Sequence, residues 1–389
     1  MKQDREKSFM NTVFVTGFFV ILGILTIFSY GFIDLNLHLS DNPVFLRFAE
    51  PLSHLVYQAR PVATGIFFII LLCMFAGYLL FLKQGKKFFP TNKKLLATII
   101  VSAVILGFSF SAFTYDLFNY ITTAKVAYTY HENPYIVMPI EIPNEPYLAF
   151  TRAANKVALY GPVWIAITAI PHYLGGGNIW RTIIAFKFMN VAVYLLMAYF
   201  IYLVTKSTDN VIFFALNPLV LIETLVSGHN DIYMMLLALV GLVLWQKSDL
   251  KYKFLACLSL FASWWVKGAT IVIGPLFFFR KLSFEKTVVM TFWLLAFVLF
   301  IIAPLREELY PWYAVWLVST ASLLPFKRYP FIVGFTIVLT FALELRQMPY
   351  IWMGYYGGPG PILRKLATVV PVALYLLFWG ARKYLKKNA

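Results

Sequence analysis

Residues that could do acid–base chemistry follow an apolar segment that ends near residue 113. The sequence there, FTYDLFNYITTAKVAYTYHENPY, places Tyr115, Asp116, Asn119 and Tyr120 at spacings of three and four, so they share one face if it is helical. A carboxylate beside aromatic residues at the end of an apolar run is costly to desolvate and is often functional. An aspartate that caps a helix explains the pattern equally well. Tyr135, in the following NPY, is either a binding residue or an interfacial anchor at a turn.

A second polar group lies in the segment NPLVLIETLVSGHND. Glu223, Ser227 and Asn230 stand at i, i+4 and i+7, which predicts one polar stripe on a helix, and His229 and Asp231 follow at its end. The His-Asn-Asp run lacks the i, i+4 histidine spacing typical of metal sites, so we expect no metal, although a divalent ion is not excluded. The alternative is a hydrogen-bond cluster at a helix end. Glu223 lies deeper in the apolar run and requires a partner or a cavity.

A lysine interrupts a third apolar stretch. Lys267 lies in ASWWVKGATIVIGP, with no carboxylate nearby in the sequence. Such a lysine either extends to the membrane interface or, presented beside a glycine at a helix junction, holds a phosphate as a point charge. The sequence leaves both interpretations open.

Three charged residues precede a group of aromatic residues in the segment REELYPWYAVW. Arg306 stands a few positions before Trp312 and Tyr313. Aromatic residues near a helix end are typical of the belts that anchor membrane proteins at the interface. The functional interpretation is a platform on which a sugar ring stacks, with a basic residue beside it.

Composition identifies the solvent in which these residues must fold. Of the 389 residues, 61% are hydrophobic and 13% are charged, with a mean hydropathy of +0.75, whereas soluble domains carry about 25% charged residues. Apolar stretches of about 20 residues recur along the chain, which predicts an all-α polytopic transmembrane helix bundle. The bilayer is then the main partner, and we expect no nucleic acid despite the net charge of +16. Cys73 and Cys257 fall in apolar runs, where packing is the expected role.

Basic residues fall at alternate helix ends, and this bias sets the expected threading. The segments assigned to the inner side carry 21 of the 33 Lys and Arg residues and 5 of the 17 Asp and Glu residues, which equals the whole net charge of +16. Both termini are therefore expected to be cytoplasmic. The twelve predicted spans are 9–33, 61–82, 95–113, 180–205, 210–227, 231–246, 254–266, 269–279, 287–303, 312–324, 329–345 and 363–381.

The apolar segment 160–174 is not counted as a span. It is short, begins with Gly-Pro and precedes GGGN, and counting it would invert the charge assignment of everything after it. We predict a helix that lies in the outer interface or enters it part way, within one long outer loop over 113–180. The short segments 254–266 and 269–279 are alternatively a re-entrant hairpin around Lys267.

The predicted organisation has three parts. Residues 1–94 form an N-terminal helix pair with a basic cytoplasmic loop, and residues 95–345 form a membrane core that contains the outer loop 113–180 and the polar residues described above. Residues 346–389 contain an outer loop, the last span and a basic tail.

Taken together and in this order, the motifs resemble those of the C-type (GT-C) glycosyltransferases, and among them the mannosyltransferases that use polyprenyl-phosphate mannose. The resembling pieces cover roughly 113–316: YDLFNY with HENPY, YGPVW at 160–164, LNPLVLIETLVSGHND at 216–231, WVKGATIVIGP at 265–275 and YPWYAVW at 310–316. The chain departs from these relatives by an additional helix pair over 9–82 and by a single aspartate where they carry an acidic pair.

The resemblance implies an inverting enzyme with a GT-C-like fold. Asp116 would be the catalytic base, and a polyprenyl-phosphate sugar would donate mannose to a lipid-linked or glycan acceptor at the outer face of a prokaryotic plasma membrane. No cofactor is implied. The residues expected to bind substrate are Tyr115, Asn119, Tyr120, Tyr135, Tyr160, Glu223, His229, Asn230, Asp231, Lys267, Arg306, Trp312 and Tyr313.

Two other functions fit parts of the pattern. A transporter or a flippase of lipids or lipid-linked glycans would use intramembrane Glu223 and Lys187 along a translocation path, but such proteins often show two related halves, and none is evident here. A glycan ligase or polymerase would share the outer site and the polyprenyl substrate but would depend on an outer arginine or histidine in place of Asp116.

Overall fold

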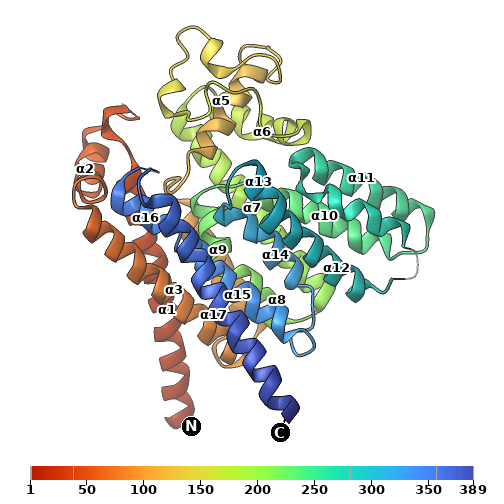
Figure 1. Cartoon of the computed structure of the whole chain (residues 1–389). Helices are drawn as coiled ribbons and strands as arrows, with labels where there is room; N and C mark the ends of the chain where they lie inside the picture. The colour runs from red at the N-terminus through yellow and green to blue at the C-terminus, as the bar shows by residue number, and fades with distance from the viewer. Residues whose placement is uncertain (1, 38, 280–281, 356, 389) are drawn as a thin grey trace.

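Helices joined by turns and loops make up the computed structural model, which describes residues 2–37, 39–279, 282–355 and 357–388 (Figure 1). No strand occurs in these ranges, which confirms the predicted all-α class. The α-helices are α1 (Lys2–Ser29), α2 (Pro43–Tyr57), α3 (Arg60–Phe88), α4 (Asn92–Gly107), α5 (Asp116–Tyr128), α6 (Pro162–Gly175), α7 (Ile179–Thr205), α8 (Thr208–Ala215), α9 (Pro218–Val220), α10 (Asp231–Trp245), α11 (Leu250–Val266), α12 (Phe284–Phe297), α13 (Ala303–Arg306), α14 (Ala314–Ala321), α15 (Pro330–Glu344), α16 (Gln347–Met353) and α17 (Gly360–Asn388).

Six helical segments in the described part of the chain are long and apolar enough to cross a membrane. They are Phe9–Phe32, Arg60–Phe88, Ile179–Thr205, Phe284–Arg306, Pro330–Met353 and Gly360–Leu385. A seventh would be the pair Thr208–Ala215 and Pro218–Val226, which is bent by 51°. The other predicted spans correspond to shorter helices, such as α10 with 15 residues and α14 with 8, so the count of twelve is not confirmed.

The N-terminal helices pack into the bundle. α1 packs against α3 and α4, and α3 also contacts α16. The Ser29 hydroxyl accepts a hydrogen bond from the Phe110 amide at 2.8 Å, and the Thr26 hydroxyl donates to the Ile105 carbonyl at 3.1 Å. These bonds join the end of α1 to the segment that leads to Asp116. The proposed division at residue 94 is not tested and stays a prediction.

The chain bends sharply between α8 and α10. Asn217 caps α9 through the Leu219 amide, and a π-helix, η5 (Leu221–Val226), follows it. Gly228 then takes φ +88°, a left-handed conformation that favours glycine. The predicted α-helical stripe of Glu223, Ser227 and Asn230 is therefore wrong: the π-helix changes the helical phase, and the His229 amide bonds to the Glu223 carbonyl at 3.0 Å.

A buried lysine stabilises the end of this π-helix. Lys187 of α7 is 1% exposed, and its ammonium donates to the Ser109 hydroxyl at 2.9 Å and the Val226 carbonyl at 2.8 Å, as well as to the Leu225 carbonyl. The last carbonyls of a helix lack helical donors and attract a cation. Lys187 thus supports the turn that carries His229.

Segment 113–180 lies at the end of the molecule opposite the two termini, where α5 and α6 project above the bundle (Figure 1). α6 has 14 residues, begins at Pro162, and is followed by Gly176, which caps the helix in the left-handed conformation. Its length agrees with the prediction that 160–174 is no full span. The predicted outer side and the cytoplasmic termini are not tested. Arg280 and Lys281, two of the predicted inner basic residues, lie outside the described residues.

The two cysteines do not pack in the core as predicted. Cys73 on α3 and Cys257 on α11 are both exposed. A helix embedded in a membrane turns apolar side chains to lipid as well as to protein. An apolar run therefore did not distinguish the inner face of each helix from its outer face.

Candidate functional site

A cavity of about 790 Å³ opens at the end of the bundle that carries α5 and α16. Its walls come from the start of α5, the 150s loop, the α11 end, the segment before α14, and α16 with the start of α17. The polar and aromatic residues that line it are Tyr115, Asp116, Asn119, Arg152, Lys156, Tyr160, Lys267, Glu307, Glu308, Tyr310, Trp312, Tyr313, Arg346, Gln347, Tyr350, Tyr355 and Arg364. Segments far apart in the sequence therefore form one chamber.

Asp116 presents a carboxylate to this cavity from the first turn of α5, where the helix dipole favours a negative charge. Its side chain is 22% exposed. The Tyr160 hydroxyl donates to Oδ2 at 3.0 Å, and the Asn119 amide donates to Oδ1 at 3.4 Å. The carboxylate is thus oriented and remains open to the cavity.

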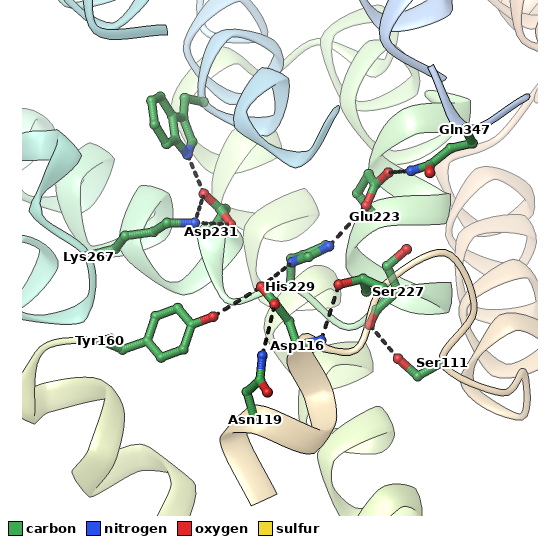
Figure 2. Close-up of polar contacts among 12 residues, drawn as sticks. Ser111, Asp116, Asn119, Tyr160, Glu223, Ser227, His229, Asp231, Lys267 and Gln347 are labelled. Carbon is green, nitrogen blue, oxygen red and sulfur yellow. Dashed lines mark hydrogen bonds and ion pairs between the residues drawn. The ribbon is translucent and has the colours of Figure 1, made fainter. Parts of the chain in front are cut away.

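Behind Asp116, a row of buried groups extends into the bundle, and Figure 2 shows them in line. Nδ1 of His229 lies 3.4 Å from Oδ2 of Asp116, and Nε2 lies 3.3 Å from Oε2 of Glu223. The Gln347 amide donates to Oε1 of Glu223 at 3.3 Å. The Trp312 ring stacks on His229 with centroids 3.8 Å apart. We call Asp116, His229 and Glu223 the histidine centre.

The histidine centre perturbs the ionisation of its members. Burial lowers the pKa of His229, but the contacts with Asp116 and Glu223 outweigh burial and raise the pKa to about 9. Burial raises the pKa of Asp116, but His229, Lys267 and Tyr160 hold it below its usual range. Near neutral pH, an imidazolium therefore lies beside an ionised Asp116.

A second ion pair forms the cavity wall nearby. The Lys267 ammonium lies 3.0 Å from Oδ1 and 2.9 Å from Oδ2 of Asp231, and the Trp316 indole donates to Oδ1 at 2.6 Å. Lys267 also lies over the Tyr313 ring, 4.9 Å from its centroid. We call Lys267, Asp231 and Trp316 the lysine centre.

The lysine centre depends on a helix break. Lys267 has extended backbone angles, φ −159° and ψ 126°, between α11 and the 3-10 helix η6 (Gly268–Phe278). The carboxylate that the local sequence lacked comes from Asp231, at the start of α10, and α10 and α11 pack closely along their length. Side-chain partners 36 positions apart are thereby brought together.

The backbone beside Tyr160 joins the two centres. The Gly161 amide donates to the Val266 carbonyl at 3.2 Å. A Cβ at residue 161 would lie 2.0 Å from the Trp265 carbonyl oxygen, so no side chain fits there without displacement. The YGP segment is therefore fixed directly against the residues that precede Lys267.

Two arginines that sequence analysis missed line the far wall. Arg346 and Arg364 both contact Glu308, at 2.6 Å and 2.8 Å. Arg346 stands at the end of the apolar run FALELRQ, where a basic residue is typical of an ordinary helix boundary. No spacing rule connects it with Arg364, 18 residues later in the sequence. Arg152 and Lys156 of the loop before Tyr160 were missed for the same reason.

The other predicted site residues lie at or behind this cavity, with one exception. Tyr120 and Asn230 are buried behind the wall, and the Tyr135 hydroxyl donates to the Tyr160 carbonyl at 2.9 Å. Tyr115 lines the cavity, with the Arg152 guanidinium 4.6 Å from its ring centroid. Arg306 is exposed and is not among the lining residues, so its predicted role gains no geometric support.

Within the described ranges, no group of three or more His, Cys, Asp or Glu side chains is arranged to hold a metal ion. The expectation that the reaction needs no metal stays a prediction, because only an activity measurement with and without metal ions tests it.

Comparison with known proteins gives the chain a family. Residues 20–282 match the family model described as alpha-(1->6)-mannopyranosyltransferase, N-terminal domain, whereas no curated protein and no solved structure matches the chain. The match begins inside the first predicted span, so most of the helix pair 9–82 is part of the family domain and not the addition predicted from the sequence. Asp116, Tyr160, His229 and Lys267 all fall within the match. The chain therefore belongs to the alpha-(1->6)-mannopyranosyltransferase family and is identified with it through the N-terminal domain of these glycosyltransferases.

Proposed function

We propose that the protein transfers mannose from a polyprenyl-phosphate donor to a lipid-linked or glycan acceptor, with inversion at the anomeric carbon and Asp116 as the base. One observation supports this most directly: an oriented carboxylate and three cations, Lys267, Arg346 and Arg364, line the same cavity of about 790 Å³. A cavity of that volume accommodates a sugar phosphate with part of an acceptor.

The proposed reaction balances with these residues alone. The acceptor hydroxyl oxygen attacks C1 of the mannosyl group as the bond between C1 and the phosphate oxygen breaks. Asp116 takes the hydroxyl proton, and polyprenyl phosphate leaves with the bonding electrons. A β-linked donor would then give an α-linked product. Lys267 offsets the charge that develops on the leaving phosphate, and Arg346 and Arg364 supply further positive potential.

The arrangement of the helices suits a lipid-linked donor. Six apolar segments of membrane length leave a surface along which a polyprenyl tail can lie, while the sugar phosphate reaches the polar cavity. We propose that this cavity opens on the outer face of a prokaryotic plasma membrane and that both termini are cytoplasmic. Cysteine labelling at Ser207 and Lys327 tests this: both positions should be inaccessible from outside.

Translocation is less well supported than glycosyl transfer. Lys187 was a candidate for a translocation path, but its ammonium already contacts three oxygen atoms at the end of η5. Glu223 contacts His229 and Gln347. These contacts favour fixed structural groups over groups that must bind and release cargo.

The proposal is tested with radiolabelled polyprenyl-phosphate mannose, candidate lipid acceptors and the purified full-length protein. We expect Asp116→Asn to lower the rate of transfer by about 10²–10⁴-fold, the usual contribution of a general base. Asp41→Asn, an exposed aspartate in the loop before α2, is the matched control and should retain full activity.

Two outcomes would contradict the proposal. Undiminished transfer by the Asp116 variant would exclude this residue as the base. If no polyprenyl-phosphate sugar gives labelled product, while the reconstituted protein moves a lipid or solute across vesicles, the transferase proposal fails.

A further inference from the structure

His229 and Glu223 are titratable groups that the proposed reaction does not use. Their side chains are 1% and 0% exposed, so neither can touch a substrate in the cavity. A buried ionisable group without a partner is costly, and such groups in the apolar part of a membrane protein commonly serve its function. Their contacts therefore indicate what they do.

Both ring nitrogens of His229 face carboxylates. Asp116 lies 3.4 Å from Nδ1 on the cavity side, and Glu223 lies 3.3 Å from Nε2 on the buried side (Figure 2). A neutral imidazole carries one N–H and satisfies one of these carboxylates, whereas an imidazolium donates to both. The parallel Trp312 ring, 3.8 Å away, adds a π face that favours a cation.

Glu223 is itself held in place. Its Oε1 accepts from Gln347, and the carboxyl group of Glu344, on α15, also faces it. Glu344, Glu223, His229 and Asp116 thus form one row that leads from α15 to the cavity.

The remaining ionisable neighbours do not replace this row. Lys267 and Tyr160 also interact with the Asp116 carboxylate, but Lys267 is already paired with Asp231. Tyr310 stacks on the Trp312 ring with centroids 4.4 Å apart, and Trp312 in turn stacks on His229. His229 is therefore the cation in direct contact with the Asp116 carboxylate within the described residues.

We propose that Glu223 and His229 are positioning residues: Glu223 keeps His229 as an imidazolium, and His229 keeps Asp116 ionised and aimed into the cavity. This inference rests on the proposed role of Asp116 as the base. It predicts a defined pH range, since activity requires an ionised Asp116 and a protonated His229. Protonation of Asp116 sets the acidic limit of activity, and His229 shifts this limit to lower pH. Deprotonation of His229 sets the alkaline limit, and Glu223 shifts that limit to higher pH.

The first test measures His229 directly, without any donor or acceptor. In the purified full-length protein with ring-labelled histidine, the His229 resonance is identified by its loss in His229→Gln. We expect it to titrate at about pH 9 in the wild type and at lower pH in Glu223→Gln. If Glu223→Gln does not fold, Asp116→Asn removes the other partner and should also lower the titration point.

A His229 resonance that titrates near 6.5 in the wild type would overturn the inference, as would one that neither partner variant shifts. The titration needs neither donor nor acceptor. A negative titration result can therefore be distinguished from the absence of mannose transfer, which would contradict the proposed function.

The second test is the pH profile of kcat/KM for mannose transfer. In His229→Gln the acidic limb should move to higher pH, and in Glu223→Gln the alkaline limb should move to lower pH. Because neither residue touches substrate, kcat should fall while the KM for the donor stays within about twofold. His172→Gln, a partly buried histidine on α6 that contacts Thr129, is the matched control and should leave both limbs in place. A fall in kcat with unmoved limbs would indicate a merely structural role and overturn the inference.

Discussion

The histidine centre and the lysine centre present opposite charges to the same cavity. In the histidine centre the carboxylate of Asp116 is 22% exposed and its cation, His229, is 1% exposed. In the lysine centre the cation Lys267 is 19% exposed and the carboxylate Asp231 is 1% exposed. A buried counter-ion thus determines which charge faces the cavity, and one cavity is lined by both a carboxylate and an ammonium group.

The centres also differ in how their buried members are supported. His229 has two carboxylate partners, so it keeps Glu223 if Asp116 is neutralised. Asp231 has the Trp316 indole and the ammonium of Lys267. Removal of the exposed member should therefore affect stability little in the histidine centre and strongly in the lysine centre.

The largest expected effect comes from Lys267→Gln. Loss of the ammonium leaves the buried Asp231 carboxylate without its cation, and breaking a buried ion pair on one side costs about 3–5 kcal/mol. Thermal unfolding of the full chain in detergent measures this loss. Lys156→Gln, an exposed lysine of the same cavity, is the matched control. Equal unfolding temperatures for the two variants would show that the lysine centre contributes no stability.

The next effect is a dependence of stability on pH that arises from His229. Its pKa is raised from 6.5 to about 9 on folding, so its contribution is fully present below pH 6.5 and is lost as the pH rises through 9. The difference amounts to about 3 kcal/mol. Wild type and His229→Gln are compared by thermal unfolding between pH 6 and 10. Parallel curves over that range would contradict the assignment of a cation to the histidine centre.

A smaller effect is expected for Tyr160→Phe, which removes the hydroxyl that donates to Asp116 at 3.0 Å. The pKa of Asp116 should rise, and the acidic limb of transfer should move to higher pH. Transfer at neutral pH should fall by about tenfold, because one hydrogen bond to a charged group contributes about 1.5 kcal/mol. Tyr135→Phe serves as the control: it removes a hydroxyl that bonds the Tyr160 carbonyl and not Asp116, so the acidic limb should stay in place.

The smallest effect is that of Asp116→Asn on stability. The amide can still accept from Tyr160, and His229 keeps Glu223, so we expect a change of less than about 1 kcal/mol despite the loss of transfer. Unfolding is measured beside that of Lys267→Gln. A destabilisation as large as that of the lysine variant would remove the proposed difference between the centres.

Sequence patterns predicted the residues that face the cavity better than the contacts among them. Asp116, Lys267 and Trp312 stand out because each interrupts or ends an apolar run, and desolvation makes such positions costly. The pairings did not follow: Lys267 meets Asp231 only because α10 and α11 pack together, and His229 meets Glu223 only through a π-helix. Helical periodicity assumes regular α-helical turns, so it placed Asn230 on the same face as Glu223, whereas the side chain that contacts Glu223 is His229.

For the fold, too, single elements were predicted better than the contacts among them. Hydropathy identified the helices of membrane length, because a helix needs about 20 consecutive apolar residues to cross the bilayer. The count of twelve spans is not confirmed, because several of the predicted spans correspond to shorter helices such as α10, α11 and α14. The Arg346–Glu308–Arg364 contacts depend on how α16 and α17 fold back, which no local pattern encodes.

Gly161 has a consequence for how this protein can evolve. Its backbone contact with the residue pair before Lys267 ties the loop that carries Tyr160 to the lysine centre, and no larger residue fits there. A change at this position would disturb the support of Asp116 and the placement of Lys267 together. Variation among lining side chains that belong to neither centre, such as Lys156, leaves that backbone contact in place.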